Sequence, residues 1–164
     1  MQKAIVWIAK FVATGAFLGC VPSILSSSKK YTGAGFIGTA IGWALLPLMP
    51  VSVWGQCAAL LAALAAALAT SQIAQMEYGI KDDPRIIIDE TVGFWMSMAF
   101  LPKTLPISLF AFALFRFFDT VKLPPIKALE RLPGGLGIVS DDVAAGIAAN
   151  MLLRCGRHLI TTVS

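Results

Sequence analysis

The stretch YTGAGFIGTAIGWALLPLMPVSVWGQCAALLAALAAALATSQIAQM, residues 31–76, contains no Asp, Glu, Lys or Arg. A helix that crosses a bilayer needs about 20 predominantly apolar residues, so this stretch is too long for one crossing and suits two. Pro47 and Pro50 mark a break between the halves. The second half, near 53–76, includes residues 58–69, which are all Ala or Leu and favour a closely packed helix. The sequence therefore predicts a pair of membrane-spanning helices.

The composition of the whole chain agrees with a membrane protein. Of the 164 residues, 57% are hydrophobic and 13% are charged, against about 45–50% and about 25% in soluble domains. The mean hydropathy is +0.79. The 13 Lys and Arg residues are scattered, which argues against nucleic acid as a partner and favours anionic lipid head groups. We expect one domain, residues 1–164, with an all-α fold: a compact helical bundle with several transmembrane helices.

Capping and turn residues delimit the other helices. Asp83-Pro84 has the form of a helix start, with Asp as the N-cap and Pro at the first helical position. Ser140 is suited to cap a last helix beginning at Asp141-Asp142, which has too few apolar residues for an obvious span. Residues 123–140, with Gly134-Gly135-Leu136-Gly137, are expected to form a loop, as are residues 26–30. The further predicted helices cover residues 4–25, 84–101, 105–122 and 141–157.

All nine acidic residues lie between Glu77 and Asp142. If residues 36–76 cross the membrane twice, both ends lie on one side, and Lys29, Lys30, Lys81 and Arg85 mark that side as cytoplasmic. The helix that starts at Pro84 then leaves this side and the helix over 105–122 returns to it. The two crossings are predicted to bring Asp82, Asp89 and Glu90 next to Arg116, Asp119 and Lys122.

This combination of residues suits phosphate hydrolysis. Mg²⁺ prefers carboxylate oxygens, and the planar guanidinium of Arg matches the geometry of phosphate. Burying unpaired acids in apolar sequence is costly, so such acids are expected to be used. The candidate metal ligands are Asp82, Asp89, Glu90 and Asp119; the candidate phosphate-binding residues are Arg116 and Lys122; the candidate catalytic residues are Asp89, Glu90, Arg116 and Asp119.

Purely structural roles stay open for the same residues. Asp89 and Glu90 could form an ion-pair network with Arg116, and Asp82 and Asp83 could serve only as helix caps. Asp141 and Asp142 could cap the last helix or take part in the site as second-rank candidates. Glu130 and Arg131 have the pattern of a solvated helix face.

Three ordered blocks of sequence resemble the phosphatidylglycerophosphatase A family. They are Lys81-Asp82 with Ile86-Ile87-Ile88-Asp89-Glu90-Thr91-Val92-Gly93-Phe94-Trp95, then Phe115-Arg116-Phe117-Phe118-Asp119-Thr120-Val121-Lys122 with Pro124-Pro125-Ile126, and last Gly134-Gly135-Leu136-Gly137 with Asp141-Asp142 and Ala145-Gly146. Toward the N-terminus the match is loose. Ala34-Gly35-Phe36 stands where the family usually has a Pro-Gly-Thr type turn, Ser23–Thr32 resembles an insertion, and a role for Thr39 does not carry over.

The resemblance implies an enzyme that removes the terminal phosphate of phosphatidylglycerophosphate with Mg²⁺, giving phosphatidylglycerol at the bacterial inner membrane. One alternative keeps the chemistry and changes the substrate to a soluble phosphomonoester. Another is a small membrane transporter or channel subunit that uses Asp89 and Glu90 as an ion path, with both carboxylates near the bilayer centre.

Overall fold

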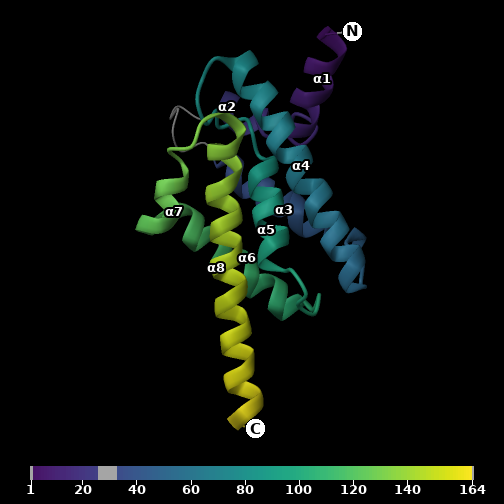
Figure 1. Ribbon diagram of the computed structural model, residues 1–164, viewed down its shortest axis with the longest axis vertical. Helices are drawn as coiled ribbons and strands as arrows, with labels where there is room; N and C mark the ends of the chain where they lie inside the picture. The colour runs from purple at the N-terminus through teal and green to yellow at the C-terminus, as the bar shows by residue number, and fades with distance from the viewer. Residues whose placement is uncertain (1, 26–32, 164) are drawn as a thin grey trace.

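The computed structural model describes residues 2–25 and 33–163, and these are helical with short connections (Figure 1). No strand occurs in the described ranges, which confirms the all-α prediction. The predicted insertion at Ser23–Thr32 and the predicted loop at 26–30 lie mostly outside the described residues. The helices are α1 (Gln2–Ala13), α2 (Cys20–Leu25), α3 (Ala34–Ala44), the 3₁₀ helix η1 (Leu46–Leu48), α4 (Val53–Tyr78), α5 (Ile88–Ser97), α6 (Leu105–Val121), α7 (Pro124–Leu129) and α8 (Gly134–Val163).

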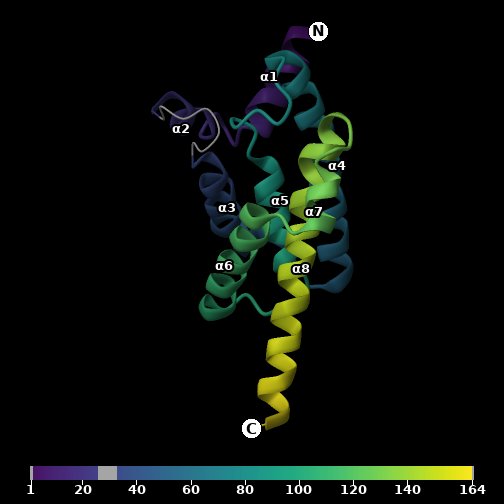
Figure 2. The same ribbon diagram turned by 90° about the vertical axis from the view of Figure 1, so that its left-hand side faces the viewer.

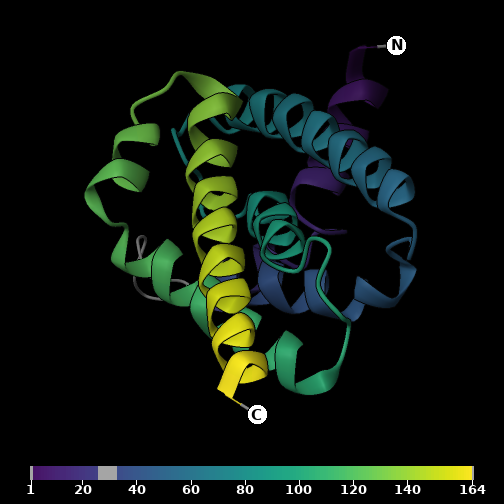
Figure 3. The same ribbon diagram turned by 60° about the horizontal axis from the view of Figure 1, so that its bottom comes forward.

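The short helix α5 lies at the centre of the bundle (Figure 3). It contacts α8, α3, α4, α6 and α1. Its apolar side chains Val92 and Phe94 are fully buried, and Phe94 belongs to a core cluster with Phe115 of α6 and Ala145 of α8. Residues of the first turn of α5 are therefore fixed by helices on every side.

Two helices, α4 and α8, are long and apolar enough to cross a membrane. α4 has 26 residues and α8 has 30, and the C-terminal part of α8 extends beyond the other helices (Figure 2). Large apolar side chains are exposed on several helices, among them Trp54 of α4 at 85% and Phe110 of α6 at 66%. Exposed apolar surface of this kind is typical of a membrane-facing protein.

The predicted helix pair over residues 36–76 is confirmed in part. The break falls at η1, where Pro47 lies, and α4 begins after Ser52, whose hydroxyl accepts a hydrogen bond from Gly55 N at 3.1 Å. The first member is wrong as a span, because α3 has only 11 residues. Of the two predicted crossings within residues 36–76, only the second, α4, reaches the length that a crossing needs.

The predicted helix over residues 4–25 is interrupted after Ala13. The Thr14 hydroxyl donates to Lys10 O at 2.8 Å and accepts from Phe17 N at 3.0 Å, which closes a turn. Gly15, Ala16 and Phe17 all have positive φ, so the chain cannot continue as a helix. The carbonyl of Ala13 instead accepts a hydrogen bond from Ile87 N at 2.9 Å. This break ties the N-terminal segment to the residue just before α5.

The prediction that a helix starts at Asp83-Pro84 is wrong, as is its end at Leu101, because α5 covers only Ile88–Ser97. Asp83 is buried and uses its carboxylate on Arg85: Oδ1 accepts from the backbone N at 3.0 Å and from Nε at 2.7 Å, and Oδ2 accepts from Nη2 at 2.7 Å. These bonds fold residues 83–85 into a turn. Asp82 and Asp89 consequently do not share a helix face.

The last helix begins earlier than predicted, at Gly134. Its first turn is held by α4, since Gln72 Oε1 accepts a hydrogen bond from Gly135 N at 2.7 Å. Asp141 and Asp142 therefore lie inside α8 and do not cap it, and the loop predicted over 123–140 contains α7 and the start of α8. The predicted helix over residues 105–122 agrees with α6 to one residue.

Close contact between two glycines joins α5 to α8. A Cβ at Gly146 would lie 2.1 Å from Gly93 O, and one at Gly156 would meet nothing within 4 Å. We expect Gly146→Ala to lower the free energy of unfolding by about 1–3 kcal/mol through overpacking. Gly156→Ala is the matched control. Its free energy of unfolding is expected to rise by up to ~1 kcal/mol, because Ala has a higher helix propensity than Gly. Thermal unfolding of both variants in detergent, followed by circular dichroism, tests this; equal stability would contradict it.

Candidate active site

One cavity of about 480 Å³ collects the predicted site residues. It lies among the first turn of α3, the turn before α5, the first turn of α5, the end of α6 and the second turn of α8. Asp141 and Asp142 also line it. The six residues predicted for the site all line this cavity: Asp82, Asp89, Glu90, Arg116, Asp119 and Lys122.

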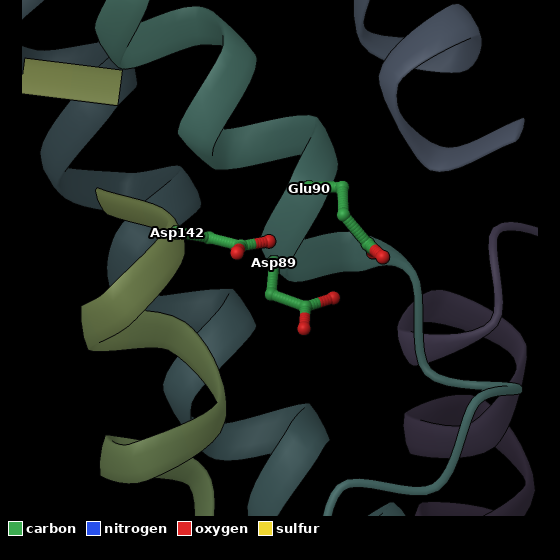
Figure 4. Close-up of side chains that lie close together, drawn as sticks. All are labelled: Asp89, Glu90 and Asp142. Atoms are coloured by element: carbon green, nitrogen blue, oxygen red, sulfur yellow. The ribbon is translucent and has the colours of Figure 1, made fainter. Parts of the chain in front are cut away.

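Three carboxylates form a compact cluster within this cavity. One oxygen each from Asp89 and Glu90 of α5 and from Asp142 of α8 lie within 4.8 Å of one another (Figure 4). Asp89 and Asp142 are buried, at 5% and 3% exposed. We call these three residues the acid cluster. Asp82 and Asp119, also predicted as metal ligands, line the cavity but do not belong to the cluster.

The acid cluster is electrostatically unfavourable by itself. Burial, and next the charge of Glu90, raise the pKa of Asp89 well above its ordinary value. Burial likewise raises the pKa of Glu90, to about 7. Buried carboxylates that cannot share charge with a partner favour protonation or a bound cation.

Arg116 is held at the edge of the acid cluster. Its guanidinium makes an ion pair with Asp119 at 2.7 Å and donates to the Thr39 hydroxyl at 3.4 Å. Among the described residues, no ion pair joins Arg116 to Asp89 or Glu90. The ion-pair network considered from the sequence is therefore replaced by the pair of Arg116 with Asp119. Gly35 makes this arrangement possible, because a Cβ there would lie 2.3 Å from Glu90 Oε1 and 3.0 Å from Arg116 Nη1.

Lys122 lies on the other side of the cavity and is bound by two acids. Its ammonium contacts Glu130 at 2.5 Å and Asp141 at 2.6 Å. Burial opposes the charge, but the two hydrogen bonds outweigh burial and raise the pKa of Lys122 above its ordinary value. Glu130 is thus part of an ion-pair network, which corrects its assignment to a solvated face. An ammonium has three donors, so one remains for a ligand.

The acid cluster fits a divalent cation by its donor atoms. Asp89 Oδ1 and Glu90 Oε2 are buried and have no hydrogen-bond partner, and the same holds for Asp141 Oδ1 nearby. Buried polar atoms are almost always satisfied in folded proteins, and hard cations prefer carboxylate oxygens. A cation at the acid cluster would satisfy the Asp89 and Glu90 oxygens and neutralise the repulsion.

Asp142 is the residue of the acid cluster that sequence reasoning ranked second. The sequence pattern predicts Asp141 and Asp142 at a helix start, whereas both lie within α8 and line the cavity. The available signal was the uninterrupted Gly134–Ser140 segment before them, which continues as helix.

Asp142→Asn gives a test of the cation site. The variant loses one of three neighbouring charges, so its unfolding temperature in EDTA is expected to rise above that of the unchanged protein. Ligand charge sets the affinity of such sites, so Mn²⁺ binding, measured by calorimetry or paramagnetic resonance, is expected to weaken at least about tenfold. Glu77→Gln, at an exposed position outside the cavity, is the control. Unchanged Mn²⁺ affinity in Asp142→Asn would exclude this residue from the site.

The fold and site together define a helical, membrane-associated protein whose polar cavity combines a cluster of carboxylates with an Arg and a Lys. The sequence model of phosphatidylglycerophosphatase A matches residues 11–157. The chain belongs to this family, which is named for a phosphoric monoester hydrolase.

Three curated relatives match parts of the chain. A phosphatidylglycerophosphatase A of Haemophilus influenzae is 39% identical over 120 residues, covering 72% of this chain and 72% of the relative. The Escherichia coli protein of the same name is 36% identical over 85 residues, 50% of this chain and 49% of the relative. A protein of Bacteroides thetaiotaomicron, named as a candidate phosphatidylinositol-3-phosphatase, is 36% identical over 83 residues, 49% of this chain and 52% of the relative.

The chain thus spans about half the length of two of these relatives. No solved structure matches it significantly.

Proposed function

We propose that this protein is a Mg²⁺-dependent phosphatase that converts phosphatidylglycerophosphate to phosphatidylglycerol at the cytoplasmic face of a bacterial inner membrane. The observation that carries the proposal is the convergence of the acid cluster, Arg116 and Lys122 on one cavity. Family membership and the names of two relatives support the substrate.

Asp89, Glu90 and Asp142 would hold the cation, with Asp82 and Asp119 as further ligands at the cavity wall. When bound, Mg²⁺ supplies charge neutralisation for phosphate oxygens and activates a water. Arg116, oriented by Asp119 and Thr39, binds two phosphate oxygens with its planar fork. Lys122 offers its remaining N–H to a third oxygen. These contacts fix the phosphate for attack from the acid-cluster side.

The hydrolysis balances with water as the only co-reactant. The water oxygen bonds to phosphorus, the bond from phosphorus to the glycerol oxygen breaks, and the leaving oxygen takes up a proton. A Glu90 oxygen that does not hold the cation would accept the proton of the attacking water, and the carboxyl group would then give a proton to the leaving oxygen.

The distribution of charge supports this orientation in the membrane. α4 ends and α8 begins at the site end of the molecule, near Lys81, Arg85, Lys127 and Arg131, and the opposite end of α8 carries Arg154 and Arg157. The greater number of cations at the site end favours a cytoplasmic site. The interruption after Ala13 also removes the need to place Lys3 on the far side.

Phosphate release from purified protein tests this function. The substrates are phosphatidylglycerophosphate, phosphatidylinositol 3-phosphate and a water-soluble phosphomonoester, each with Mg²⁺. We expect turnover of the first to exceed that of the others. Preference for the soluble ester would favour the alternative substrate class, and ion flux in liposomes without phosphate release would favour a channel.

A further inference from the structure

A second cavity adjoins the active site at the cytoplasmic end proposed above. It has a volume of about 360 Å³ and is lined by Lys81, Asp82, Glu130, Arg131, Gly137 and Ile138. Asp82 and Ile138 also line the active-site cavity. The two cavities therefore share a wall.

The far wall of the second cavity is held in place by close backbone packing. A Cβ at Gly137 would lie 2.3 Å from Leu132 O and 3.1 Å from Glu130 O. The connection from α7 to α8 can thus fold directly onto the first turn of α8. Two backbone hydrogen bonds, Arg131 N to Ala128 O at 3.3 Å and Leu132 N to Leu129 O at 3.0 Å, fix the same connection.

The second cavity contains two acids and two cations, and they differ in their partners. Glu130 is paired with Lys122 at 2.5 Å, and Lys122 also pairs with Asp141 at 2.6 Å. Lys81 and Arg131 form no ion pair with any other described residue and are exposed to the cavity opening. Asp82 belongs to the wall shared with the acid cluster. Two cations are consequently available to one ligand.

Exposed apolar residues flank the lining residues of the second cavity in the sequence. Each of three exposed apolar residues is next in sequence to a lining residue: Ile80 at 53%, Leu132 at 38% and Leu136 at 51% exposed. An anionic group followed by hydrocarbon matches this succession of cations and apolar side chains.

We propose that the second cavity binds the phosphodiester of the lipid substrate through Lys81 and Arg131 while the terminal phosphate occupies the active-site cavity. This inference rests on the proposed function and deepens it. A phospholipid with a phosphodiester and a terminal phosphomonoester would engage both cavities, and a monoester lipid such as phosphatidate would engage one. Lys81 and Arg131 would thereby determine substrate specificity.

The test compares two lipids in Lys81→Gln, Arg131→Gln and the double variant. We expect the double variant to lower the ratio of kcat/KM for phosphatidylglycerophosphate to that for phosphatidate by about tenfold or more, the effect of losing about one charge-assisted hydrogen bond. Lys127→Gln, an exposed position on α7 outside both cavities, is the control. A ratio equal to that of the unchanged protein overturns the proposal, whatever happens to the absolute rates.

A binding measurement separates this inference from the proposed function. Glycerophosphoglycerol contains the diester and no monoester, so it is expected to bind the unchanged protein and Asp89→Asn alike and to bind the double variant at least about tenfold more weakly. If the unchanged protein shows this binding pattern but does not hydrolyse phosphatidylglycerophosphate, the proposed phosphatase function is contradicted and the anion site is retained. Absence of binding, equal binding in the double variant, or complete displacement by inorganic phosphate would overturn the anion site for a diester.

Discussion

Asp89→Asn is expected to reduce phosphate release from phosphatidylglycerophosphate about a thousandfold, because the cation that Asp89 would hold contributes several kcal/mol of charge stabilisation in the transition state. Asp89 is buried, its Oδ1 has no partner, and it lies in the acid cluster between α5 and α8. The amide keeps the size of the side chain and removes its charge. The loss should therefore appear in kcat and in cation affinity together, measured by initial rates over a Mg²⁺ titration.

The folding of Asp89→Asn can be checked independently. Because the substitution removes one of several neighbouring negative charges, the variant is expected to unfold at an equal or higher temperature than the unchanged protein in EDTA. Glu77→Gln, which makes the same chemical change outside the cavity, should keep its activity. A folded Asp89→Asn protein with full activity would remove Asp89 from the mechanism.

Removal of divalent cations is expected to abolish hydrolysis and to leave the helical fold intact. The apolar core that α5 forms with α4, α6 and α8 contains no residue of the acid cluster, so the circular dichroism spectrum in EDTA should be unchanged. Added Mg²⁺ should restore turnover and raise the unfolding temperature by the mass-action gain of a ligand that binds only the folded state.

Ca²⁺ gives the comparison for this metal prediction. It prefers more ligands and longer bonds than Mg²⁺, so we expect it to raise the unfolding temperature without restoring the rate. Phosphatase activity that persists after exhaustive chelation, confirmed by metal analysis, would contradict a metal-dependent mechanism.

The sequence predicted the place of the site more accurately than its supporting helices. Asp89, Glu90, Arg116, Asp119 and Lys122 meet in one cavity as expected, because the chain reverses direction near Lys103 and returns along α6. Their catalytic and metal-binding roles stay predictions. The apolar length of residues 53–76 and the break near Pro47 were also sufficient to place α4.

The errors have a common physical cause: side chains from distant or neighbouring residues replaced the expected caps. Asp83 has the form of an N-cap but bonds to Arg85, so α5 starts later. Gln72 of α4 caps the first turn of α8, so that helix starts earlier. Thr14 closes a turn on Lys10 inside an apolar stretch. Rules for helix ends did not anticipate the two local contacts, and they cannot anticipate Gln72, which only the tertiary fold brings to the start of α8.

The central position of α5 bears on how this family could diversify. A helix enclosed by five neighbours tolerates few substitutions, so we expect the acids of α5 to vary little among relatives. The Lys81 turn and the connection from α7 to α8 lie at the surface and can change without disturbing that core. Selection for a new lipid head group would therefore change residues in these two surface segments and leave the acids of α5 unchanged.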